Sequence, residues 1–138
     1  MLKKLVLTGA VAVTVAGLAG ASWASTTRDA HAGQLSCAGA VSWKRAGAFV
    51  GRTATLKGPV KSTKYAAYSN GSPTFLDIGR PYPREGLAIV IWIENRAAFG
   101  RPEVKYRGHT ICVRGAVQRY NGIPEIVARS PRQIGIIR

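Results

Sequence analysis

Residues 110–128, TICVRGAVQRYNGIPEIVA, carry the clearest structural signal in the sequence. Two runs of mostly apolar and β-branched residues, 110–120 and 123–128, flank the dipeptide Asn121-Gly122. Asn-Gly between two such runs is the strongest short-range signal for a β-hairpin, because both central residues of its tight turn take a positive φ. The sequence therefore predicts a pair of antiparallel strands near the end of the chain.

Three further strands are predicted upstream of this hairpin. Residues 53–65 alternate as a strand does, and the interruption at Gly58-Pro59 indicates a bulge where the strand bends. Residues 74–78 follow a polar turn and end at Gly79. Residues 87–93 are apolar at both parities, which predicts a central strand covered on both faces.

Short helices complete the expected element order. Ser42 is typical of an N-cap, and it predicts a helix from Trp43 to Phe49 whose two aromatic rings pack on the body. A second brief helix is expected over 94–99, between the third and fourth strands. The tail from Arg129 is expected to cover an edge. This order predicts an all-β fold with one or two short helices, a small five-stranded barrel of the oligonucleotide/oligosaccharide-binding (OB) type.

Several stretches also resemble a known family. Four stretches together carry this resemblance: VGRTATLKGPVKST, GSPTFLDIGRPYP, IVIWIENR and GHTICVRGAVQRYNGIPEIVA. Through them the chain resembles the nucleic-acid-binding OB-fold modules found alone or appended to bacterial nucleases and DNA-handling proteins. The resemblance covers about Val41 to Ile134. It implies the fold more strongly than the ligand, because OB domains host many functions.

The N-terminus has the layout of a secretory signal peptide. Lys3 and Lys4 precede an uncharged apolar run and then small residues, so we expect cleavage of residues 1–32; a membrane anchor is the alternative. Residues 33–40 are then an N-terminal extension and 41–138 the OB domain. The formal charge of the whole chain is +14, and removing three cations and one aspartate with residues 1–32 leaves +12. We expect a basic, secreted or extracytoplasmic protein that is a monomer.

Export favours a disulfide between the two cysteines of the chain. Cys37 and Cys112 are expected to form a disulfide, because such bonds persist in oxidising compartments; two buried free thiols are the alternative. A bridge across this loop stabilises by about 4 kcal/mol in the chain-entropy model.

The residues give little support to metal, cofactor or catalytic chemistry. There is no Cys-x-x-Cys, and His109 is the one histidine that remains after residue 32, without an identifiable nucleophile to serve. No metal and no cofactor are therefore expected. A small secreted nuclease that uses carboxylates is a less favoured alternative, and Asp77 is more simply a hydrogen-bond acceptor for an arginine or a turn amide. The acids that remain are spread over separate elements: Asp77, Glu85, Glu94, Glu103 and Glu125.

Binding has better support than catalysis. OB barrels bind ligands across their second and third strands and between two loops, where this chain carries cations interleaved with aromatic rings. Cations follow the phosphates of an unpaired strand, and rings stack with bases at about 1–3 kcal/mol each. The candidate nucleic-acid-binding residues are Lys61, Lys64, Tyr65, Tyr68, Phe75, Arg80, Tyr82, Arg84, Arg119 and Tyr120.

The turn RPYP at 80–83 follows from the same reasoning. Its two prolines restrict the backbone around Tyr82, which can present the ring to a base or pack it over the barrel end. The leading hypothesis is a secreted, non-catalytic OB module for polyanions, above all single-stranded DNA or RNA, with weak sequence preference. The alternative is an envelope module that binds anionic lipid or cell-wall polymer through charge alone. Aromatic rings that share one face with the cations favour the first hypothesis.

Overall fold

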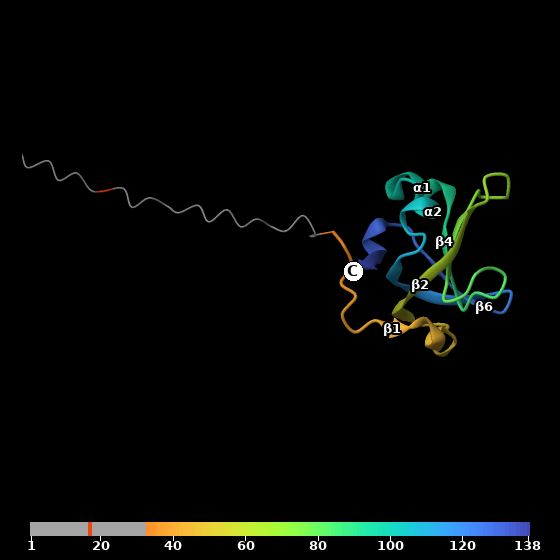
Figure 1. The fold of residues 1–138 in the computed structure, drawn as a ribbon, viewed down its shortest axis with the longest axis horizontal. Coiled ribbons are helices and arrows are strands. Elements are labelled where there is room, and N and C mark those ends of the chain that lie inside the picture. Colours follow the sequence, from red (N-terminus) through yellow and green to blue (C-terminus); the bar gives the residue numbers. More distant parts are fainter. Residues whose placement is uncertain (1–16, 18–32) are drawn as a thin grey trace, which may run out of the picture.

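Five strands of the chain close into a barrel (Figure 1). The computed structural model describes residue 17 and residues 33–138. Neighbouring strands follow the order β2-β3-β4-β6-β5, and β5 pairs back onto β2. All these pairs are antiparallel except β4–β6, which is parallel. Counted along the chain this is the ring 1-2-3-5-4-1, which confirms the predicted OB-type barrel. The strands are β2 (Thr53–Tyr65), β3 (Thr74–Ile78), β4 (Leu87–Ile91), β5 (Thr110–Tyr120) and β6 (Ile123–Val127).

Two short strands extend this ring. β1 (Val41–Ser42) pairs in parallel with β2, and β7 (Ile134–Ile137) pairs antiparallel with β5. The predicted tail over an edge is thus a strand, preceded by the 3-10 turn η2 (Pro131–Gln133) with a capping box at Ser130. The sequence does not signal β1, because two residues are too few to show a period.

β2 changes its partner half way along its length. Residues Thr53 to Pro59 pair with β5, and Val60 to Tyr65 pair with β3. The register shifts between Val60 and Ser62, so the bulge lies at Lys61 and the prediction of a bulge at Gly58-Pro59 is wrong by two residues. Gly58 has another role, because a Cβ there would overlap the ring of Trp43.

The Trp43 ring closes one end of the barrel. Trp43 is the first residue of the 3-10 helix η1 (Trp43–Phe49), which is the short helix that the sequence predicts. The Ser42 hydroxyl caps this helix, because it accepts a hydrogen bond from the Lys44 amide at 3.3 Å. Cβ atoms built at Gly58, Gly79 and Gly86 would each overlap the indole, so three glycines form its bed. Both Trp43 and Phe49 pack against the core, as predicted.

Two short helices cover the opposite end (Figure 1). α1 (Ile93–Phe99) and α2 (Pro102–Lys105) lie between β4 and β5. β4 ends at Ile91, two residues earlier than predicted, because Trp92 is already the N-cap residue of α1. α2 was not predicted; a single turn shows no helical period.

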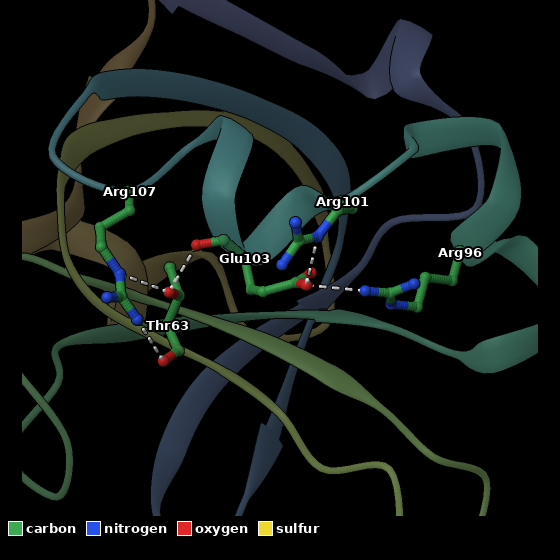
Figure 2. Close-up of polar contacts among 5 residues, drawn as sticks. All are labelled: Thr63, Arg96, Arg101, Glu103 and Arg107. Carbon is green, nitrogen blue, oxygen red and sulfur yellow. Dashed lines mark hydrogen bonds and ion pairs between the residues drawn. The ribbon is translucent and has the colours of Figure 1, made fainter.

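A polar network holds α2 against β2 (Figure 2). The Thr63 hydroxyl donates to the Glu103 carbonyl at 2.7 Å and accepts from Arg107 Nε at 2.9 Å. Arg96 Nη2 lies 2.7 Å from Glu103 Oε1. Because Thr63 is buried, its two partners satisfy a hydroxyl that would otherwise destabilise the barrel end.

The core fills the inside of the ring. Its largest fully buried side chains include Leu56, Leu76, Ile78, Leu87, Ile89, Ile91, Tyr106, Ile111 and Ile126.

Within the described part of the chain, no helix is long and apolar enough to span a membrane. The predicted signal peptide, residues 1–32, lies outside the described residues except for residue 17.

The predicted disulfide is confirmed. Cys37 bonds to Cys112, with their Cα atoms 5.6 Å apart. Cys112 lies on β5 and is fully buried, and the arm before Cys37 crosses Gly135 of β7 so closely that a Cβ there would overlap the Leu35 carbonyl oxygen. The bridge therefore fastens the N-terminal arm to two strands.

We expect Gly86→Ala to lower the unfolding free energy by about 1–3 kcal/mol, because the new methyl overlaps the Trp43 ring. Trp43→Ala should cost about 3 kcal/mol. The double variant should cost less than the sum, because no clash remains once the ring is gone. Gly47→Ala is the matched control, since its Cβ would meet only Arg119 Nη2 at 3.7 Å. Urea unfolding measures all four; strictly additive costs would contradict the glycine bed.

Reduction of the disulfide should lower the unfolding free energy by about 4 kcal/mol, because the 75-residue separation closes a long loop. The double variant Cys37→Ser, Cys112→Ala should show the lower stability with and without reductant. Denaturant titrations in the two conditions compare them. A wild-type midpoint that does not move with dithiothreitol would contradict the expected role of the bridge.

Candidate ligand-binding groove

A groove of about 680 Å³ runs over the outer face of the barrel. Its floor comes from β2, β3, β4 and β6. Its walls are the turn after β3 and the tip of the β5–β6 hairpin, which lie side by side in Figure 1. The lining residues are Ser62, Thr63, Lys64, Ala66, Ser69, Phe75, Asp77, Tyr82, Pro83, Glu85, Ala88, Tyr120, Asn121, Ile123 and Glu125.

One row of paired residues crosses the floor of the groove. Ser62 pairs with Asp77, Asp77 with Ala88, and Ala88 with Glu125. Gln118 pairs with Glu125 at the far end of the row. Because paired residues share a face of the sheet, these side chains project away from the core. Ala88 therefore leaves a hollow between two carboxylates.

Ser62 ties the turn after β3 to the floor. Its hydroxyl donates to Asp77 Oδ2 at 2.6 Å and accepts from the Tyr82 amide at 3.0 Å. We predicted an arginine or a turn amide as the donor to Asp77, and this is wrong, because the bulge at Lys61 places Ser62 between the carboxylate and the turn. The turn is thus held at its centre, beside the cis Tyr82–Pro83 bond.

The carboxylates of the groove are deeply set. Burial raises the pKa of Asp77, the hydrogen bond from Ser62 opposes this, and the nearby Glu85 charge adds to the rise. Glu85 Oε2 is buried and has no hydrogen-bond partner among the described residues. Glu125 is 8% exposed, and its Oε1 accepts from Gln118 Nε2 at 2.9 Å.

The structure brings together three of the five predicted aromatic residues. Phe75, Tyr82 and Tyr120 line the groove, and the two tyrosines are 73% and 65% exposed. Tyr68 is fully exposed on the loop between β2 and β3, whose Ala66 and Ser69 line the groove.

Tyr65 lies on the other side of the sheet. Lys64 pairs with Phe75 over the groove, so its neighbour Tyr65 faces the helical end of the barrel. There the Arg96 guanidinium lies over its ring, 3.9 Å from the centroid. This ring therefore already has a cation as its stacking partner.

The predicted cations are divided in the same way. Lys64 lines the groove, Lys61 is exposed at the bulge next to Ser62, and Arg80 and Arg84 are exposed on the tied turn. Arg80 also lies 6.0 Å from the Trp43 ring centroid. Arg119 does not join them: it donates to the Gly122 carbonyl at 2.9 Å and lies near Gly47 of η1.

Sequence reasoning missed the polar floor. The five acids are expected to be scattered, yet the strand register brings Asp77 and Glu125 to the groove, and the turn after β3 adds Glu85. A usable signal was present, since Asp77 and Glu125 are each the one charged residue of a mostly apolar strand. Among the residues that the structure describes, no group of three histidine, cysteine or acidic side chains could hold a metal ion.

Comparisons with known proteins give only remote structural likenesses. No protein-family model matches the chain, and no curated protein matches its sequence. The Stn1–Ten1 complex of S. pombe matches with a TM-score of 0.45 and 17% identity over 62% of this chain and 58% of that chain. An OBody bound to hen egg-white lysozyme matches with a TM-score of 0.46 and 16% identity over 66% of this chain and 84% of that one. The N-terminal domain of PriB from Thermoanaerobacter tencongensis matches with a TM-score of 0.37 and 24% identity over 62% and 96% of the two chains.

The chain thus spans less than two thirds of the first of these structures. The assignment of the barrel depends on the strand order and register of this chain itself, which are those of an OB fold.

We expect Asp77→Asn to gain stability over the wild type as pH rises. The pKa of Asp77 is raised above 3.8 in the native state, so below 3.8 the carboxyl is neutral in both states and contributes its full stability. As pH rises through the native pKa, the wild type must ionise a buried group and loses that contribution, whereas asparagine stays neutral. Unfolding free energies between pH 3 and pH 7 measure the difference. Glu94→Gln, an exposed carboxylate on α1, is the control; equal pH profiles for the two variants would contradict the raised pKa.

Proposed function

We propose that the protein is a secreted, non-catalytic OB module that binds single-stranded nucleic acid in the groove, with most of the affinity independent of sequence. The observation that carries the proposal is the gathering of Phe75, Tyr82 and Tyr120 in one groove that Lys64 also lines, with further exposed cations on the β2 bulge and on the turn after β3. The groove lies where OB barrels bind oligonucleotides, across their second and third strands and between loops.

The rings suit base stacking. Two of them are largely exposed, Tyr82 on the turn after β3 and Tyr120 on the hairpin. A base has an apolar face that an exposed tyrosine can cover, and this contact tolerates any base. Because the Ser62 bond already fixes the turn, Tyr82 loses little conformational freedom on binding.

The charge suits a nucleic-acid backbone. Residues 33–138 carry a formal charge of +12, and Lys61, Lys64, Arg80 and Arg84 are exposed beside the groove. Each phosphate that these cations neutralise releases about 0.7 counterion from a single strand, which makes affinity depend on salt.

Export of the protein is part of the proposal. The signal-peptide layout of residues 1–32 supports it, and so does the Cys37–Cys112 disulfide, since reducing compartments keep thiols free. We place the protein among the bacterial OB modules that its sequence resembles, as an exported single-domain member.

The charge alone favours a second candidate function, binding to anionic lipid or cell-wall polymer. That function needs no aromatic rings. Substitution of the rings therefore separates the two candidates.

We expect Tyr82→Ala and Tyr120→Ala each to weaken binding of a fluorescent oligonucleotide by about 1–3 kcal/mol, because each removes a stacking surface. Heparin affinity should barely change, because heparin has no bases. Lys64→Ala should weaken the binding of both oligonucleotide and heparin, and it should make the salt dependence of affinity shallower. Tyr65→Ala is the matched control: its ring faces away from the groove, so oligonucleotide affinity should stay the same.

Anisotropy titrations at two salt concentrations, on variants with checked melting temperatures, measure these effects. Two results would overturn the proposal. The first is that the tyrosine variants bind the oligonucleotide as tightly as the wild type does. The second is that anionic vesicles displace the oligonucleotide and that the tyrosine substitutions change neither affinity.

A further inference from the structure

The groove is the acidic part of a basic protein. Of the five acidic residues beyond residue 32, three line it, whereas Lys64 is its one lining cation among the described residues. A phosphate on the floor would meet carboxylates in a site of low dielectric, where like charges repel strongly. A nucleic acid in this groove must therefore keep its backbone at the cationic edge and turn its bases toward the floor.

The floor offers hydrogen-bond acceptors that have room for donors. Asp77 receives one bond, from Ser62 at Oδ2, and Glu125 receives one, from Gln118 at Oε1. Within residues 33–138 no hydrogen bond reaches the second oxygen of either carboxylate. Acceptors this deeply set favour a ligand that supplies N–H groups.

Glu125 is the better placed of the two for a base. It is 8% exposed against 3% for Asp77, and its side chain is longer by one methylene. Its floor neighbour is Ala88, whose methyl leaves space for a planar ring.

A stacking surface stands beside Glu125. Tyr120 pairs with Ile123 while Gln118 pairs with Glu125, so Tyr120 and Glu125 are diagonal neighbours on one face. Diagonal neighbours are about 7 Å apart, a span that a single base can bridge between ring and carboxylate. A base on Tyr120 can therefore direct its edge to the Glu125 carboxylate, whose Oε2 is free and whose Oε1 keeps one lone pair beside the bond from Gln118.

Building on the proposed function, we propose that the groove selects guanine at one position, with the base stacked on Tyr120 and its N1–H and N2–H donors on the Glu125 carboxylate. Guanine alone has two adjacent donors on its Watson–Crick edge, which match the two oxygens of a carboxylate. Adenine and cytosine each set a ring-nitrogen acceptor beside their amino group. Thymine and uracil flank their one N–H with two carbonyls. Each of these bases would turn an acceptor toward a carboxylate oxygen, which is unfavourable in a buried site.

The test uses single-stranded oligothymidylates that carry one central guanine, inosine, adenine or cytosine. Inosine is the matched ligand, because it keeps N1–H and lacks only the N2 amine. We expect guanine to bind about tenfold more tightly than inosine, the effect of one hydrogen bond to a charged group, and more tightly than the other bases. Glu125→Gln should bring the guanine-to-inosine ratio close to one, since an amide has a single acceptor.

Controls separate selectivity from affinity. Glu94→Gln removes the same charge from exposed α1, so it should change affinity slightly and leave the ratio intact. Tyr120→Ala should weaken all four oligonucleotides. Glu125→Asp is the substitute variant if Glu125→Gln does not fold. It keeps the negative charge but moves it one methylene away from the base, so it should also lower the guanine-to-inosine ratio.

The outcomes are distinguishable from failure of the proposed function. Equal affinities for the four oligonucleotides would overturn the proposed guanine selectivity and would be consistent with the proposed binding of single-stranded nucleic acid. Loss of the ratio in Asp77→Asn but not in Glu125→Gln would overturn the assignment to Glu125. If no oligonucleotide binds the wild type, the proposed function and this inference fail together.

Discussion

The bend of β2 allows five strands to close into a barrel. One strand can close a barrel only if it serves two partners, and β2 does so by leaving β5 near Pro59 and joining β3 from Val60. The Trp43 indole lies at this switch, on glycines from β2, from the end of β3 and from the start of β4. A Cβ at any of those positions would overlap the Trp43 ring and displace it from this end of the barrel. The packing of this ring therefore requires glycine at all three positions.

The same bend creates the groove. The bulged Lys61 reverses which residues of β2 face outward, so that Ser62 and Lys64 face the groove while the Thr63 hydroxyl and the Tyr65 ring point to the helical end. Ser62 then reaches both Asp77 and the Tyr82 amide. One irregularity in the backbone thus places the floor, the turn and the cation edge together, and a regular strand would separate them.

The sequence predicted the long elements well because their signals are local. The hairpin at Asn121-Gly122, β2 and β3 follow from two-residue alternation and turn residues, and the barrel follows from their order. The predicted end of β4 was less accurate, because the apolar run of this strand continues through Trp92 into α1. Single-turn and two-residue elements carry no period and were missed.

The site was only partly predictable, for a physical reason. Aromatic residues and cations were found by type, but the face that each occupies depends on where the bulge lies, and Tyr65 shows how one residue of register changes the outcome. The meeting of Asp77 with Glu125 depends on the pairing of β3, β4 and β6, which tertiary closure sets. No local pattern contains that information.

The two ends of the described chain lie on the side of the barrel away from the groove (Figure 1). Gly33 and Arg138 border one small cavity, while the turn after β3 and the hairpin tip project on the opposite side. The disulfide fastens the N-terminal arm to this rear side through β5. Whatever is joined to either end, whether a second domain, a fluorescent label or a solid support, thus attaches behind the barrel. An attachment at either end therefore leaves the turn after β3 and the hairpin tip free on the far side of the barrel.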